Sequence, residues 1–113
     1  MRWLVVSAIG LAFPVFGVSA ENFATCLLDE LPGLQSDIAA YSVRKVCATK
    51  YPGMLDAVEQ GSGRGWFGYG SGAECIAKKA AKTPSRVAAG MITAACNKLY
   101  DAPRYLSDKE VFG

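Results

Sequence analysis

Histidine is absent from this chain of 113 residues, and charged residues make up only 19% of it. The lack of histidine excludes imidazole general bases, Ser-His and Cys-His nucleophile pairs and every histidine-ligated metal site. At this length one small domain is expected, which excludes a large substrate cleft between two domains. Long uncharged apolar stretches are also lacking, apart from residues 3–20 at the N-terminus.

Residues 1–20 have the features of a cleavable export signal. A basic residue precedes the uncharged stretch, and Val18-Ser19-Ala20 places small or β-branched residues at the positions that a signal peptidase reads. An uncleaved membrane anchor is the alternative, but the stretch is slightly shorter than the roughly 20 residues that span a bilayer, and Pro14 interrupts it. We therefore predict cleavage after Ala20 and an exported protein, periplasmic or secreted.

All four cysteines follow the predicted signal, at Cys26, Cys47, Cys75 and Cys96. In an oxidising compartment such a set favours two disulfides. A zinc site and C-x-x-C redox chemistry both need closely spaced cysteine pairs, and no pair in this sequence has that spacing. We expect no metal and no cofactor.

The cysteine spacing also indicates an internal repeat. Successive cysteines lie 21, 28 and 21 positions apart, so a shift of 49 positions superposes the first pair on the second. The same shift aligns further residues: Ala24 with Ala73, Ser36 with Ser85, Ala39-Ala40 with Ala88-Ala89, and Tyr51 with Tyr100. We infer two copies of one supersecondary unit. The repeat allows all three cysteine pairings, but a self-sufficient unit favours Cys26 with Cys47 and Cys75 with Cys96.

Each copy is predicted to be a helical hairpin, which gives an all-α fold stapled by disulfides. In the first copy, apolar residues recur at helical spacing until Pro32-Gly33, and a second helix over residues 36–50 follows. Its predicted apolar side comprises Ile38, Ala39, Ser42, Val43 and Val46. The predicted organisation is a signal peptide at 1–20, a first hairpin at 21–60, a Gly/aromatic loop at 61–72, a second hairpin at 73–100 and a tail at 101–113.

In the second copy, Thr83-Pro84 predicts a helix start, with an N-cap hydroxyl followed by proline in the first turn. The predicted apolar stripe of that helix comprises Val87, Ala88, Met91, Ile92, Ala95 and Leu99. A core of this size is marginal without disulfides.

The two copies carry opposite charge. Residues 21–60 hold six acidic and three basic side chains, whereas residues 61–113 hold four acidic and eight basic ones. Opposite charges at equivalent sites would let the hairpins face each other without repulsion. One basic patch is expected from helical spacing, at Lys78, Lys79, Lys82 and Arg86. It is either a solvated face or a contact for an acidic partner or an anionic membrane surface.

The Gly/aromatic loop holds the other candidate contacts. Its formal G-x-G-x-x-G, starting at Gly63, is not a dinucleotide site because no strand and no βαβ unit surround it. The loop is either a flexible linker or an aromatic surface that caps the core or binds a partner. The candidate binding residues in it are Arg64, Trp66, Phe67 and Tyr69.

Catalysis has little support in the sequence. Ser42 and Lys45 spell S-x-x-K, but the companion K-T-G and S-D-N elements are missing and the chain is too short for the domain that carries them. We therefore expect no enzyme. The prediction is a binding module with a protein partner in the cell envelope, and the alternative is a membrane-surface protein that uses the basic patch. Nucleic acid is excluded as a ligand, because the exported chain has 11 basic and 10 acidic residues.

Overall fold

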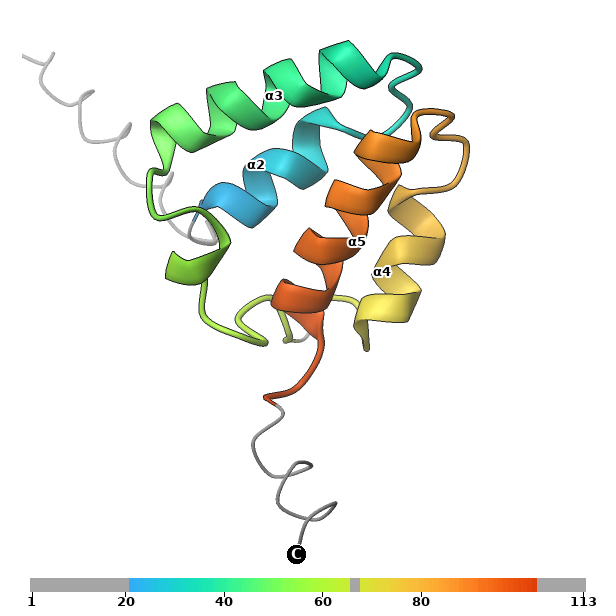
Figure 1. Cartoon of the computed structure of the whole chain (residues 1–113). Helices are drawn as coiled ribbons and strands as arrows, with labels where there is room; N and C mark the ends of the chain where they lie inside the picture. The colour runs from blue at the N-terminus through green and yellow to red at the C-terminus, as the bar shows by residue number, and fades with distance from the viewer. Residues whose placement is uncertain (1–20, 66–67, 104–113) are drawn as a thin grey trace, which may run out of the picture.

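The computed structural model describes residues 21–65 and 68–103 (Figure 1). The described chain contains no strand. Its elements are α2 (Phe23–Glu30), α3 (Asp37–Lys50), the 3-10 turn η1 (Met54–Ala57), α4 (Gly72–Lys79) and α5 (Arg86–Tyr100). The predicted all-α fold is confirmed. The predicted signal peptide, Trp66, Phe67 and residues 104–113 of the tail lie outside the described residues.

The internal repeat is visible in the helix boundaries. The first residues of α2 and α4, Phe23 and Gly72, are 49 positions apart, and so are the first residues of α3 and α5. The turns that join each helix pair also match. Leu34 N–H donates to the Leu31 carbonyl at 3.1 Å, and its counterpart Thr83 N–H donates to the Ala80 carbonyl at 3.1 Å. The fold is therefore a duplicated helical hairpin, and the second copy starts one residue before the predicted boundary.

Each helix begins at a polar cap. Asn22 and Thr25 form a reciprocal capping box at α2, and serines at positions 36, 71 and 85 cap the other three helices. The predicted start of α5 at Thr83-Pro84 is wrong by two residues, because Ser85 Oγ accepts from Ala88 N–H at 3.0 Å. Thr83 Oγ1 instead accepts from Gly33 N–H at 2.9 Å, in the turn of the other hairpin.

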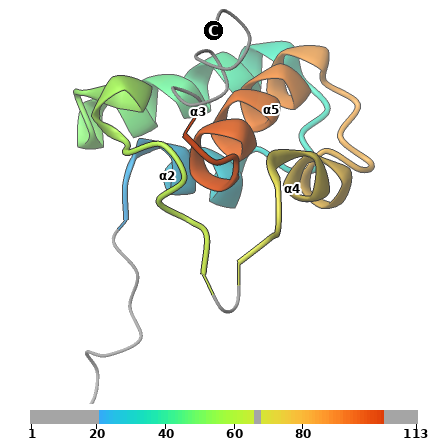
Figure 2. The ribbon, with the colours of Figure 1, turned by 90° about the horizontal axis from the view of Figure 1, so that it is seen from below.

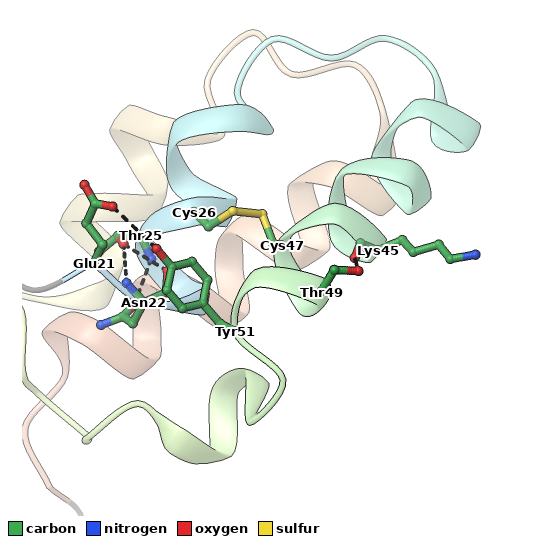
Figure 3. The surroundings of a disulfide bond; sticks show 8 residues. All are labelled: Glu21, Asn22, Thr25, Cys26, Lys45, Cys47, Thr49 and Tyr51. Carbon is green, nitrogen blue, oxygen red and sulfur yellow. Dashed lines mark hydrogen bonds between the residues drawn. A yellow bond between two sulfur atoms is a disulfide. The ribbon is translucent and has the colours of Figure 1, made fainter.

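The disulfides join the two helices of each hairpin. Cys26 of α2 bonds to Cys47 of α3 (Figure 3), and their Cα atoms are 5.9 Å apart. Cys75 of α4 bonds to Cys96 of α5, with 5.5 Å between Cα atoms. The favoured pairing is confirmed. Because disulfides persist in oxidising environments, both bonds indicate a compartment outside the reducing cytosol. Among the described helices, none is long and apolar enough to cross a membrane.

The core lies between α2 and α5. Helix α2 buries Phe23, Ala24, Leu27 and Leu28, and α5 buries Ala88, Ile92, Ala95, Cys96 and Leu99. Four of the six residues of the predicted stripe are therefore buried, whereas Val87 and Met91 are half-buried. Helices α3 and α4 flank this pair and bury two residues each, one of them a cysteine. The flanking helices therefore depend on the disulfides more than on their apolar area.

The predicted apolar side of α3 is wrong for three of its five residues, whereas Ala39 and Val43 are half-buried. Ile38 and Val46 are 78% and 55% exposed, and Ser42 is exposed as well. The buried residues are Ala40 and Cys47, because the disulfide fixes which side of the helix faces α2. The larger apolar side chains of α3 consequently point to solvent.

The two hairpins meet through their turns, which lie side by side in Figures 1 and 2. Ser85 N–H donates to the Leu34 carbonyl at 3.1 Å. Ser85 Oγ donates to Asp37 Oδ1 at 2.6 Å, and Val87 N–H donates to the same oxygen at 3.4 Å. Asp37 of the first copy thus supports the N-terminus of α5 in the second copy, where a negative charge is favourable. The residue equivalent to Asp37 in the second copy is Arg86. An acidic residue there would have placed a second carboxylate at the same contact.

Candidate functional site

A groove of about 490 Å³ opens between α2, η1, α3 and α5, within the size range of small-molecule sites. We call it the inter-hairpin groove, because both copies line it. Its apolar lining comes mainly from three elements: Phe23 and Leu27 of α2, Met54 and Leu55 of η1, and Val87, Met91 and Ala94 of α5. The site therefore presents an apolar surface on a scaffold fixed by two disulfides.

Helical periodicity explains the contribution of α5. Val87, Gly90, Met91 and Ala94 recur along one side of the helix and line the groove, while Ala88, Ile92 and Ala95 point into the core. Gly90 lies in the middle of this side. A Cβ atom built on Gly90 would have no neighbouring atom within 4 Å, so the groove is open at this point.

Two arginines belong to the groove lining. Arg44 comes from α3 and Arg86 is the first residue of α5. Arg44 Nη2 lies 3.9 Å from Met54 Sδ, a weak contact that places the guanidinium beside the apolar lining. Asp56 is the carboxylate that lines the groove, and Tyr41 contributes a phenol. With both arginines protonated, the lining carries a positive balance.

The structure places one of the predicted site residues, Arg86, in this groove; none of the lysines Lys78, Lys79 and Lys82 lines it. The four residues do not share one helix, because α4 ends at Lys79 and α5 starts only at Arg86, and their grouping into one basic patch stays a prediction. Lys82 lies in the intervening turn with a φ of 61°. The lysines and Arg86 therefore belong to different elements.

The predicted residue Arg64 belongs to a segment that caps the C-terminus of α5. Four donors satisfy the last four carbonyl groups of this helix. The donor and acceptor pairs are Gln60 Nε2 to Asn97 at 2.8 Å, Gly61 N–H to Lys98 at 2.7 Å, Gly63 N–H to Leu99 at 2.8 Å, and Arg64 Nη1 to Tyr100 at 2.8 Å. The glycine at 63 is required because a Cβ there would lie 2.8 Å from the Tyr100 ring.

Tyr69, another predicted site residue, packs on the same helix end. Its ring meets that of Tyr100 edge to face, with 5.2 Å between centroids. Burial and the neighbouring Tyr69 raise the pKa of Tyr100. In the first copy the equivalent tyrosine, Tyr51, donates to Glu21 Oε1 at 3.4 Å (Figure 3), and partial burial with this carboxylate raises the pKa of Tyr51.

A second hollow of about 500 Å³ lies beside this cap, lined in part by Asn22, Thr25, Arg64 and Tyr100. Its polar groups are largely used within the protein. Asn22 and Thr25 bond to each other in the capping box of α2, and Arg64 bonds to α5. This hollow therefore offers fewer available groups to a ligand than the inter-hairpin groove.

Sequence reasoning missed Tyr41, Arg44 and the methionines of the groove. A usable signal was a departure from the repeat, since the shift of 49 positions pairs Tyr41 with Gly90 and Arg44 with Thr93. All four positions are helical, and a large or charged residue in the first copy is replaced by a small or neutral residue at the equivalent position of the second copy. Such differences mark sites that the shared scaffold does not require.

No protein-family model matches this chain, and no curated protein or solved structure is detectably similar to it. The geometry of the described residues is therefore the basis for a function.

Proposed function

We propose that this chain is an exported, non-enzymatic binding module and that its ligand site is the inter-hairpin groove. One observation carries the proposal: apolar side chains from α2, η1 and α5 converge on a groove of about 490 Å³ that two arginines also line. The signal-like residues 1–20 support export, and so do the two disulfides.

The chemistry of the lining favours binding over catalysis. Its charged groups are the guanidiniums of Arg44 and Arg86 and the carboxylate of Asp56. Guanidinium groups suit the binding of anions through their N–H donors, and they are not among the usual acid–base groups of enzymes. One carboxylate, with a tyrosine phenol as the other ionisable group besides the arginines, is a weak basis for acid–base chemistry.

The scaffold favours a preformed site. The Cys26–Cys47 disulfide ties α2 to α3, which both line the groove, and the buried residues of α2 and α5 pack together and hold the third wall in place. A preformed apolar site binds with little ordering cost, which is the main penalty for small ligands.

Substitution at Gly90 tests this proposal. A phenylalanine at this position would fill open space in the groove without a clash at Cβ. Ala77→Phe is the matched control, since Ala77 is exposed on α4 and does not line the groove. We expect the neutral dye Nile red to bind the wild-type protein saturably, Gly90→Phe to weaken this binding about tenfold or more, and the control to leave it unchanged. Equal binding by wild type and Gly90→Phe, or no binding at all, would contradict the proposal.

A second candidate function is association with an anionic membrane surface. The exposed apolar residues of α3, Ile38, Tyr41 and Val46, favour it, because they stand beside Lys45 and Lys50 on the same helix. This arrangement shifts the expected membrane contact from the predicted lysine patch to α3. A protein partner that contacts Trp66 and Phe67 stays a prediction.

A further inference from the structure

We infer that the groove binds a single-chain amphiphile with an anionic headgroup, a carboxylate or a phosphate monoester. This inference rests on the proposed function and adds the chemical class of the ligand. The alkyl chain would lie on the apolar lining, and the headgroup would meet Arg44 and Arg86.

The apolar lining fits an alkyl chain. Phe23 and Leu27 form a rigid part of it, since both are buried in the core with 3% and 2% exposure. Met54 and Met91 add flexible thioether side chains, which adapt to chains of varied shape. The groove volume of about 490 Å³ lies in the lower part of the range for ligand sites, which suits one short chain.

The arginines define the headgroup. A guanidinium presents a planar set of N–H donors that matches carboxylate and phosphate oxygens. Among residues 21–65 and 68–103, the Arg44 guanidinium contacts only the Met54 sulfur, at 3.9 Å, and this contact uses little of its donor capacity. Arg86 starts α5 from the second hairpin, so an anion bound by both side chains would bridge the two copies.

Two carboxylates lie near the arginines, and one of them lines the groove. Asp56 is the carboxylate in the lining, against two arginines. Asp37, which neighbours the start of α5, accepts hydrogen bonds from Ser85 Oγ and Val87 N–H and does not line the groove. A cationic headgroup would therefore meet a net positive site, and an anionic one is preferred.

Calorimetric titration of the full exported chain with three probes of equal chain length tests the inference. The probes are decanoate, decyl phosphate and decyltrimethylammonium, each below its micellar concentration. We expect one or both anionic probes to bind about tenfold or more tightly than the cationic probe. Comparison of the two anions then identifies the preferred headgroup.

Arginine variants provide the second arm of the test. Arg44→Gln and Arg86→Gln keep a polar side chain but remove the charge, and each is expected to weaken binding of the anionic probe about fivefold. Lys78→Gln is the matched control, because Lys78 is exposed on α4 away from the groove, and it should leave binding unchanged.

The outcomes separate this inference from the proposed function. Equal affinity for anionic and cationic probes, with Nile red still displaced, overturns the headgroup assignment and leaves the groove as a binding site. Failure of all three probes and of Nile red overturns both proposals. Binding to phosphatidylglycerol vesicles without binding to either free anion overturns the inference in favour of a membrane contact.

Discussion

At the residue scale, Lys82 adopts a backbone conformation that suits glycine. Its φ is 61°, and the residue at the equivalent position of the first copy is Gly33, with a φ of 86°. An L-residue in this region costs about 1–2 kcal/mol, whereas glycine costs about 0.5–1 kcal/mol through its greater freedom in the unfolded chain. We expect Lys82→Gly to raise the free energy of unfolding by about 0.5–1 kcal/mol in urea denaturation.

Two control variants isolate the backbone effect. Lys82→Ala removes the same charge but keeps the unfavourable φ, so it should give no such gain. Gly33→Ala should cost about 1 kcal/mol, although no atom lies within 4 Å of the added Cβ. A Lys82→Gly protein no more stable than Lys82→Ala would refute the strain at this position.

Tyr100 links stability to alkaline pH. Burial and the neighbouring Tyr69 raise its pKa, so the folded protein holds the phenol proton more tightly than the unfolded chain does. The stability from this difference is fully present below the ordinary phenol pKa of about 10, and it is lost as the pH rises through the folded-state value. Denaturation measured across this range should show a decline that Tyr100→Phe reduces. Because the pKa of Tyr51 is also raised, part of the decline will persist. An identical decline in both proteins would contradict this assignment.

At the scale of the helices, the disulfides hold the elements that pack least. Helices α3 and α4 bury two residues each, whereas α2 and α5 form the core. Each bond closes a segment with a sequence separation of 21 residues, which corresponds to about 3 kcal/mol in the chain-entropy account.

Removal of one disulfide should therefore allow one flanking helix to unfold locally. In a Cys26→Ala, Cys47→Ala double variant we expect a loss of about 3 kcal/mol and faster amide hydrogen exchange in α3, with α4 and α5 still protected. The matching double variant at Cys75 and Cys96 should release α4 instead. Uniform loss of amide protection across all helices in either variant would show that α3 and α4 do not unfold independently of the rest of the protein.

The sequence predicts the elements better than their contacts. The helices and the repeat follow from periodicity, turn residues and cysteine spacing, all of which act locally or within one copy. The spacing left all three cysteine pairings open, and the expectation of a self-sufficient unit favoured the observed one. The exposed side of α3 and the start of α5 could not be predicted from these local signals. Ile38 and Val46 have the spacing of core residues, but the Cys47 disulfide sets the rotation of α3 and leaves both exposed. Thr83 has the sequence of a helix cap, but its hydroxyl accepts a hydrogen bond from Gly33 N–H instead.

At the scale of the whole molecule, the two copies have kept one scaffold and diverged in charge. Asp37 and Arg86 occupy equivalent positions, yet Asp37 supports the start of α5 while Arg86 lines the groove. The groove could not be predicted from the sequence because it combines residues of four elements from both copies. Arg86 and the apolar stripe of α5 could be identified from the sequence. The contact of Arg44 with Met54 depends on the turn between α3 and η1, and the groove itself depends on how α5 packs beside the first copy.

The central claim is that the inter-hairpin groove is the ligand site, and amide chemical-shift mapping of the isotopically labelled protein during a decanoate titration tests it most directly. Saturable shifts are predicted at Arg44, Met54, Gly90 and Met91, with Ala77 on α4 unaffected. Shifts confined to the 61–72 loop or to Lys78–Lys82, or no saturable shift in the groove, would contradict the claim.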